Sequence, residues 1–250
     1  MDLNIIIEKA ISSFEDESLI VEKSTPVISF GDFRGARVLT LGINPSHREF
    51  LDSNKKLLSG KLKRLEDFES LNVSDRSDLN FRHGKLIFEA CCNYFKGNNS
   101  YRWFSELEPI LKIFNSSYSD GTAAHLDLVQ WATEKIWSQL SKDEKKKLLN
   151  NGKQFLNNQI KQSNCKLIFL NGRTVIREFE RSFNLKLNYK DIHGLIKNRA
   201  SMVYGNFDNN IKIIGCSTNI QSSRGMNYDH MEEIIKNIKD IIDKWEKNKY

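Results

Sequence analysis

The stretch Val38-Leu39-Thr40-Leu41-Gly42-Ile43-Asn44-Pro45-Ser46-His47 joins an apolar run to a polar loop. Apolar and β-branched residues that stop at Gly-Ile-Asn-Pro predict a buried strand ending in a tight loop. In open α/β sheets, ligands bind beyond the carboxyl ends of the strands, so we expect functional side chains here. Pro45 fixes its own φ and biases Asn44 toward extended backbone, which holds the Asn44 side chain in a set direction. An ordinary Asn-Pro turn is the alternative interpretation.

Further apolar runs predict the rest of a sheet. The three other expected core strands are Ala123 to Val129, Lys166 to Leu170 and Lys212 to Cys216, the last paired in a hairpin with Met202 to Tyr204. Helical spacing of apolar residues predicts helices near Leu3–Phe14, Leu86–Phe95, Pro109–Phe114, Ser141–Ile160, Arg173–Phe179 and Asp229–Trp245. The basic region Leu51 to Asn80 is predicted to be a helix with flexible ends or a mobile flap over the site.

Strands that alternate with helices favour the α/β class with a parallel sheet covered on both faces. We expect a three-layer α/β/α sandwich with a central, mainly parallel four-stranded sheet. A chain of 250 residues fits one domain of this kind, spanning residues 1–250.

Composition narrows the class of function. The chain has 38 Lys and Arg against 32 Asp and Glu, which gives a net charge of +6 and a pI near 9.0. This excess of positive charge suits a polyanionic partner such as DNA. If the charge is spread thinly over the molecule, it indicates only a soluble surface. The cysteines form no Cys-x-x-Cys pair, so we assign no metal and no cofactor. No apolar run reaches the length of a membrane span and no leader pattern opens the chain, so we expect a cytoplasmic monomer that does not enter a membrane.

The order of strand-end motifs resembles the uracil-DNA glycosylase superfamily over roughly Val38 to Gly225. The four ends are Gly42-Ile43-Asn44-Pro45, Asp127, Asn171-Gly172-Arg173 and Ser217 to Gly225. Family members carry Gly-x-Asp-Pro or Gly-x-Asn-Pro after the first strand, and the version here is similar to mismatch-type and single-strand-selective members. The resemblance implies that Asn44 positions the attacking water. Ile43 and Ser46, on either side of the Asn-Pro pair, are assigned to the substrate pocket.

Two positions depart from the family pattern. Asp127 falls where the family has a base-reading Asn. A carboxylate only accepts hydrogen bonds, so it suits the exocyclic amine of cytosine and repels O4 of uracil. Ser217 to Arg224 falls where the family has a His-Pro-Ser-Pro loop, but Thr218 stands near the position of the His and no Pro is present. Asn219 or Gln221 would then donate to the leaving base.

Other residues complete the expected site. Hydrolysis of an N-glycosidic bond needs an oriented water, help for the departing base and a pocket for an extruded nucleotide. His47 and backbone N–H groups of its loop are the candidate donors, although His47 is equally suited to a surface or capping role, and Phe50 is a candidate to stack on the base, in competition with Phe81. The residues assigned to DNA contact are Arg173, Asn219, Gln221, Ser222, Ser223 and Arg224.

We therefore expect a monofunctional DNA glycosylase that acts on a modified cytosine-type base and leaves an abasic site. Glucosylated hydroxymethylcytosine in phage DNA would be such a base, which would make the activity a defence against phage. Repair of uracil or another deaminated base is one alternative. A catalytically inactive DNA-binding module of the same fold is another, and Asp127 could instead be a buried cap with satisfied hydrogen bonds.

Overall fold

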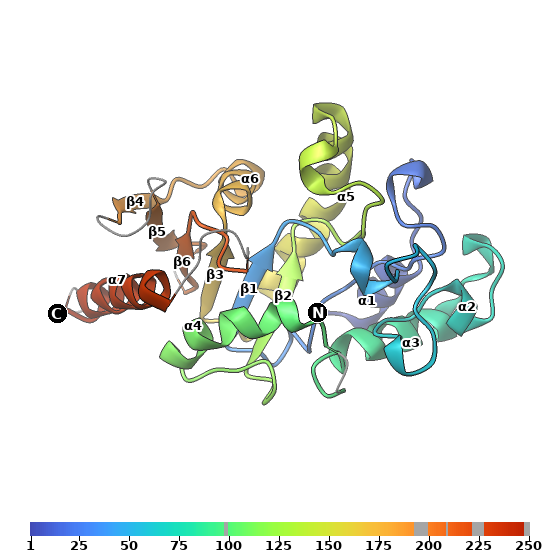
Figure 1. Cartoon of the computed structure of the whole chain (residues 1–250), viewed down its shortest axis with the longest axis horizontal. Coiled ribbons are helices and arrows are strands. Elements are labelled where there is room, and N and C mark those ends of the chain that lie inside the picture. Colours follow the sequence, from blue (N-terminus) through green and yellow to red (C-terminus); the bar gives the residue numbers. More distant parts are fainter. Residues whose placement is uncertain (98–99, 193–199, 209, 222–227, 248–250) are drawn as a thin grey trace.

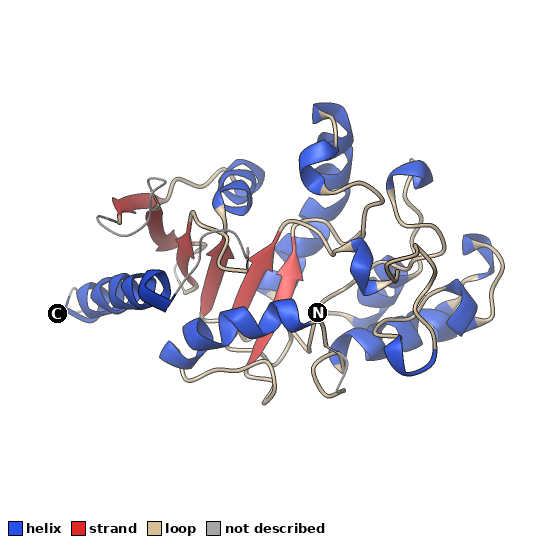
Figure 2. Ribbon diagram, in the orientation of Figure 1, coloured by secondary structure: helices blue, strands red, loops and turns tan. Residues whose placement is uncertain are grey.

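The computed structural model describes residues 1–97, 100–192, 200–208, 210–221 and 228–247. It is an α/β fold around one mixed six-stranded sheet, in the order β2-β1-β3-β6-β5-β4 (Figures 1 and 2). The strands are β1 (Val38–Gly42), β2 (Ala123–Asp127), β3 (Leu167–Asn171), β4 (Asn188–Asp191), β5 (Ser201–Asn206) and β6 (Lys212–Cys216). The α/β class expected from the sequence is confirmed.

The four strands β2-β1-β3-β6 are parallel neighbours and form the core of the sheet. Every residue of β1, β2 and β3 is buried, as expected for parallel strands covered on both faces, and this explains why they read as nearly continuous apolar runs. Parallel pairing brings their carboxyl ends to one edge, where Gly42 is paired with Asp127, and Asn171 with Cys216. This edge is where the site is expected.

The expected sheet of four strands was wrong in strand number, because β4 and β5 extend it. The β5–β6 hairpin is confirmed, with Met202 opposite Cys216. Strand β4 pairs with β5 in antiparallel fashion at the edge of the sheet and is largely exposed. Its residues, Asn-Tyr-Lys-Asp, lack the apolar alternation that identifies a strand, so the sequence gives no sign of it.

Most of the predicted helices are present. They are α1 (Leu3–Ala10), α3 (Phe81–Cys92), α4 (Glu108–Ile113), α5 (Lys142–Lys161), α6 (Arg173–Phe183) and α7 (Tyr228–Lys247). Ser141 begins α5 through the expected capping box, because its side chain accepts from the Glu144 N–H while the Glu144 carboxylate accepts from the Ser141 N–H. In Figure 1, α6 lies above the strands, and α4 and α7 lie below them.

The region from Leu51 to Asn80 is not the basic helix that was predicted. It holds isolated turns and one short helix, α2 (Phe68–Leu71). Lys55, Gly60 and Asn72 have positive φ, a backbone conformation that ends a helix. Leu58, Leu65 and Phe68 are buried although no single helix contains them, so their near-helical spacing reflects a chain that touches the core at intervals rather than a helix face.

No helix within the described ranges combines the length and the apolarity that crossing a bilayer requires.

Candidate functional site

Asn44 lies two residues beyond the carboxyl end of β1, and its half-buried side chain is held by both amide hydrogens. Its Nδ2 donates to Thr133 Oγ1 and to the Pro45 carbonyl, each at 3.0 Å. Thr133 in turn donates to the Lys135 carbonyl at 2.7 Å. None of the described residues donates to Asn44 Oδ1. The fixed amide therefore has an acceptor oxygen available for a water or a substrate group.

Asp127 ends β2 beside Gly42, and its side chain fills the space that Gly42 leaves empty. A Cβ on Gly42 would collide with Asp127 Oδ1 and would stand 2.8 Å from His125 Nε2. The Asp127 residue is 7% exposed, and its Oδ1 lies 3.5 Å from His125 Nε2. Its carboxylate accepts no hydrogen bond from the described residues, so a buried cap with satisfied hydrogen bonds does not describe it.

Behind Asp127 runs a chain of buried polar groups. The hydroxyls of Tyr118 and Thr40 lie 2.6 Å apart, and Thr40 Oγ1 lies 2.7 Å from His125 Nδ1. His125 Nε2 is buried, has no hydrogen-bond partner among the described residues, and lies 3.5 Å from Asp127 Oδ1. The rings that pack around the imidazole are Phe30, Trp103 and Phe104. Because Nδ1 is engaged by Thr40, the polar chain presents Nε2 and the Asp127 carboxylate together toward the end of the sheet.

Glu49 is a second buried carboxyl in the loop after Asn44. It is 2% exposed, and its Oε2 accepts from the Tyr94 hydroxyl at 2.7 Å. Burial raises the pKa of Glu49 to about 7, and the negative charge of Asp127 adds to that rise, while the bond from Tyr94 and the charge of Arg64 oppose it. A carboxyl with such a pKa changes its protonation at neutral pH, which is frequent at functional sites.

The other residues expected in this loop occupy different environments. Ser46 accepts from the Arg48 N–H at the start of a short 3-10 turn. His47 lies in the same turn and is half-buried, and burial, helped by the charge of Arg48, lowers its pKa, which keeps the imidazole neutral at pH 7. Phe50 is 1% exposed within the core, so its ring cannot stack on a base without rearrangement, and that expectation is not retained.

A hollow of about 390 Å³ opens where β1, β3 and β6 end. Its lining includes Ile43, Asn171, Arg173, Ser217 and Asn219. Ile43 and Arg173 are thus brought together as expected, and Arg173 begins α6 directly after the positive-φ Gly172.

Asn171 organises the polar side of this hollow. Its Nδ2 donates to Asn219 Oδ1 at 3.1 Å and to Gln221 Oε1 at 2.5 Å, and its Oδ1 accepts from the Ile220 N–H at 2.9 Å. Gln221 also donates to the Trp103 carbonyl and is only 7% exposed. The assignment of Gln221 to DNA contact is therefore not retained, because its amide is engaged inside the protein.

Three residues assigned to DNA contact, Ser222, Ser223 and Arg224, lie outside the described residues. In the part of the chain that is described, no group of three or more His, Cys, Asp and Glu side chains could hold a metal ion.

Sequence reasoning assigned no role in the site to Glu49, His125 and Thr133, and it named Asn171 only as part of a strand-end motif. Glu49 and Thr133 sit in polar runs that read as surface, and only the tertiary structure buries them. The signal in the sequence that could have identified Asn171 and His125 was their position relative to the end of a strand. Asn171 is the last residue of its strand, as Asp127 is of β2, and His125 is two residues before Asp127 and therefore points to the same face of the sheet.

No protein-family model matches the chain, and a search of curated proteins finds no match.

Proposed function

We propose that the chain is a monofunctional DNA glycosylase that hydrolyses the N-glycosidic bond of an extruded nucleotide. The observation that carries the proposal is the placement of Asn44 and Asp127 at adjoining strand ends. Asn44 has its amide hydrogens fixed and its oxygen available, and Asp127 has a sheltered carboxylate without donors from the described residues. The Asn44 oxygen suits a water, and the Asp127 carboxylate suits the base.

Asn44 Oδ1 is suited to orient the attacking water, whose oxygen bonds to the anomeric carbon as the bond to the base breaks. The base leaves with the bonding electron pair and takes up a proton, while the water releases one proton to solvent, so that the products are a sugar hydroxyl and the neutral base. An amide orients water but cannot take its proton as a carboxylate does, so turnover is expected to be modest. His47, neutral at pH 7, can offer one N–H to the leaving base, together with the loop N–H groups.

Asp127 is proposed to select the base. The Asp127 carboxylate accepts no hydrogen bond from the described residues, and the exocyclic amine of a cytosine-type base would supply a donor to it. The O4 of uracil would instead place an acceptor against an acceptor. This favours a cytosine-type base, modified in the case of phage DNA, where excision would leave abasic sites only in foreign DNA. Defence against phage is the biological role that we propose on this basis.

One assay tests the reaction and its substrate. Duplexes that carry uracil, hypoxanthine, cytosine, hydroxymethylcytosine or glucosylated hydroxymethylcytosine are incubated with the protein and then treated with alkali, which breaks the strand at abasic sites. We expect breaks at a modified cytosine. Breaks at uracil or hypoxanthine alone would assign the protein to repair of deaminated bases. Binding without breaks at any base would identify a DNA-binding module.

A further inference from the structure

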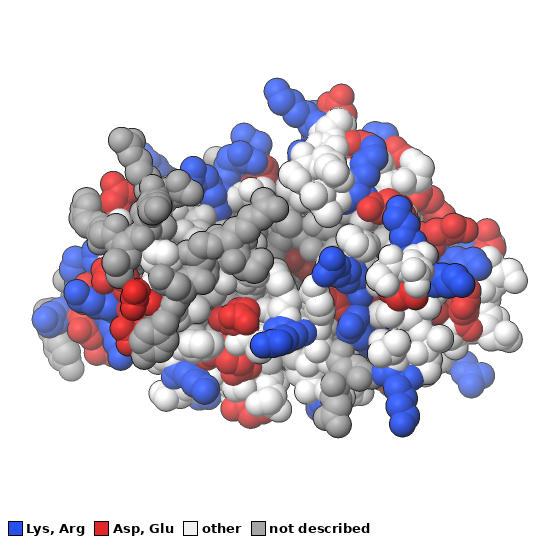
Figure 3. Space-filling view, viewed as in Figure 1, with Lys and Arg blue, Asp and Glu red and all other residues white. Residues whose placement is uncertain are grey.

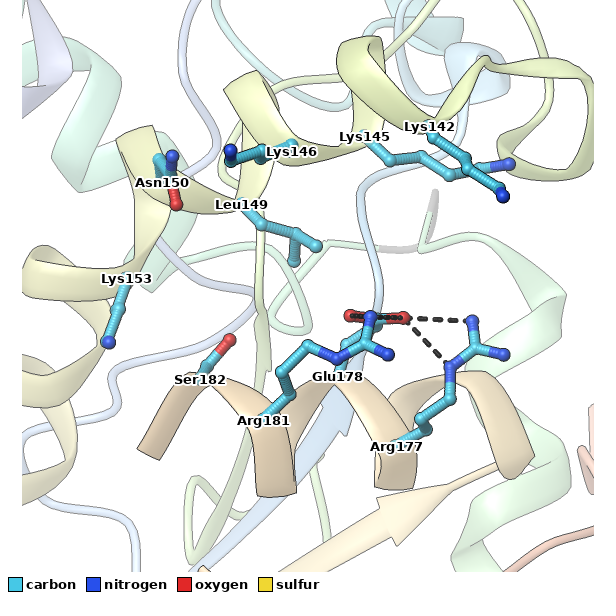
Figure 4. Close-up of a pocket in the computed structure, with 10 residues that line it drawn as sticks. All are labelled: Lys142, Lys145, Lys146, Leu149, Asn150, Lys153, Arg177, Glu178, Arg181 and Ser182. Atoms are coloured by element: carbon cyan, nitrogen blue, oxygen red, sulfur yellow. Dashed lines mark hydrogen bonds and ion pairs between the residues drawn. The ribbon is translucent and has the colours of Figure 1, made fainter. Parts of the chain in front are cut away.

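A groove between α5 and α6 gathers positive charge. Its volume is about 720 Å³, and a single carboxylate, Glu178, is among the residues that line it. The cationic side chains of this α5–α6 groove are Lys142, Lys145, Lys146, Lys153, Arg177 and Arg181. Figure 4 shows the four lysines on one helix and the two arginines on the other, with the arginine side chains pointing toward the first helix.

The lysines of α5 lie on one face of that helix. The intervals from Lys142 to Lys145 and Lys146, and from Leu149 to Lys153, are those of neighbours along one side of a helix. From Lys142 to Lys153 the helix rises by about 16 Å, a length of duplex axis over which one DNA strand carries roughly five phosphates, at one phosphate per about 3.4 Å of axis. The acidic Asp143 and Glu144 are not among the residues that line the groove.

On the α6 side, Glu178 holds the two arginines in place. The Glu178 side chain is 7% exposed; its Oε1 accepts from Arg177 Nε at 2.9 Å, and its Oε2 lies 3.2 Å from an Arg181 guanidinium nitrogen. The outer parts of both guanidinium groups remain exposed. A guanidinium fixed in this way keeps donors for a phosphate and has already lost part of its conformational freedom.

The groove adjoins a hollow whose lining includes Ile43, the residue before Asn44, but neither Asn44 nor Asp127. Lys145 and Arg177 line both the α5–α6 groove and the hollow at the ends of β1, β3 and β6, where Ile43 and Asn171 lie. In contrast, acidic and basic side chains are interspersed over much of the face shown in Figure 3. The six groove cations repel one another across a narrow gap, and this favours a polyanion there.

We propose that the α5–α6 groove binds the sugar–phosphate backbone of a DNA strand and directs it to the candidate site. That the strand is the one carrying the extruded nucleotide rests on the proposed function. The affinity of the groove for phosphates does not depend on the proposed function.

The test measures the affinity for a labelled single-stranded oligonucleotide of unmodified bases by fluorescence anisotropy over a series of KCl concentrations. The variant is Lys142→Gln/Lys146→Gln/Lys153→Gln, whose side chains are exposed and for which no hydrogen bond or ion pair is described. Each phosphate contact contributes about 0.7 to the slope of log affinity against log salt for single strands, so the slope should become shallower by about 2. Affinity at low salt should fall with it.

The matched control is Lys236→Gln/Lys239→Gln/Lys244→Gln, which removes the same charge from exposed positions of α7. It should keep the wild-type slope. An unchanged slope in the groove variant, or an equal change in the control, would overturn the proposal. Because anisotropy reports binding and not bond cleavage, an inactive glycosylase would leave this result intact, and loss of cleavage alone would not produce it.

Discussion

Gly42 on β1 and Asp127 on β2 are paired across the two strands, and the Asp127 carboxylate occupies the space that a side chain on Gly42 would fill. The glycine of the Gly-Ile-Asn-Pro loop is therefore required by packing rather than by a positive φ. Gly42 lets the Asp127 carboxylate approach the backbone of β1. The position of this carboxylate is one of the two features on which the proposed chemistry depends.

Gly42→Ala should displace the Asp127 and His125 side chains. Overpacking of a buried site typically costs about 1–3 kcal/mol, and we expect a loss of that size in the free energy of unfolding, measured by urea denaturation. Glycosylase activity should fall with it. Gly35→Ala is the control, because a Cβ there meets nothing within 4 Å. Equal stability of the two variants would show that the space beside Asp127 is not constrained.

Thr133→Val should loosen Asn44, because Thr133 Oγ1 accepts from Asn44 Nδ2. The substitution leaves one Asn44 amide hydrogen without its acceptor and the Lys135 carbonyl without its donor, which should cost about 1–3 kcal/mol of stability. The catalytic rate constant should fall while KM for DNA is kept. Thr133→Ser retains the hydroxyl and should restore the rate; a Ser variant as slow as the Val variant would argue against a positioning role for this bond.

Glu49→Gln should change how stability depends on pH. The native state holds the Glu49 proton up to about pH 7, whereas the unfolded chain releases it near the ordinary pKa of 4.5, so the native state is favoured at low pH. That advantage, of order 3 kcal/mol, should disappear as pH rises from about 4.5 to about 7.

Glu49→Gln keeps an acceptor for Tyr94 and removes the titration, so the variant should be more stable than wild type at pH 8 and should lack this decline. Tyr94→Phe is the control, since it keeps the carboxyl and should keep the decline. Urea denaturation across this pH range measures both variants, and a wild-type profile for Glu49→Gln would assign the titration to another group.

Asp127→Asn should alter the choice of base. An amide both donates and accepts, so it tolerates uracil, whereas the carboxylate accepts only. A base contact of this kind discriminates by about 1–3 kcal/mol, or roughly 5- to 150-fold in the ratio of kcat/KM for cytosine-type bases to that for uracil. The ratio should fall by that factor. If both substrates are cleaved in the wild-type proportion, Asp127 does not contact the base.

The parallel core could be predicted from the sequence because its strands are buried on both faces and end at polar residues. The capping box at Ser141 and the apolar face of α6 were equally local signals. Strand β4 could not be found, because an exposed edge strand made of polar residues has no hydrophobic pattern.

The site was predictable only at the end of a strand or just beyond it. Asn44 and Asp127 were found in this way. The burial of Glu49 and Phe50 depends on how the loop folds back onto the core, and the contact between Asn44 and Thr133 joins residues 89 positions apart. Gln221 appeared to be a surface donor until its bonds to Asn171 and to Trp103 placed it inside.

The rate of abasic-site formation by Asn44→Ala under single-turnover conditions tests the central claim most directly. Without the amide oxygen the water loses its orientation, and misplacement of a reacting group costs about 100-fold or more. We predict a loss of at least that size with unchanged affinity for DNA. Cleavage at the wild-type rate would remove Asn44 from the chemistry and would contradict the proposed mechanism.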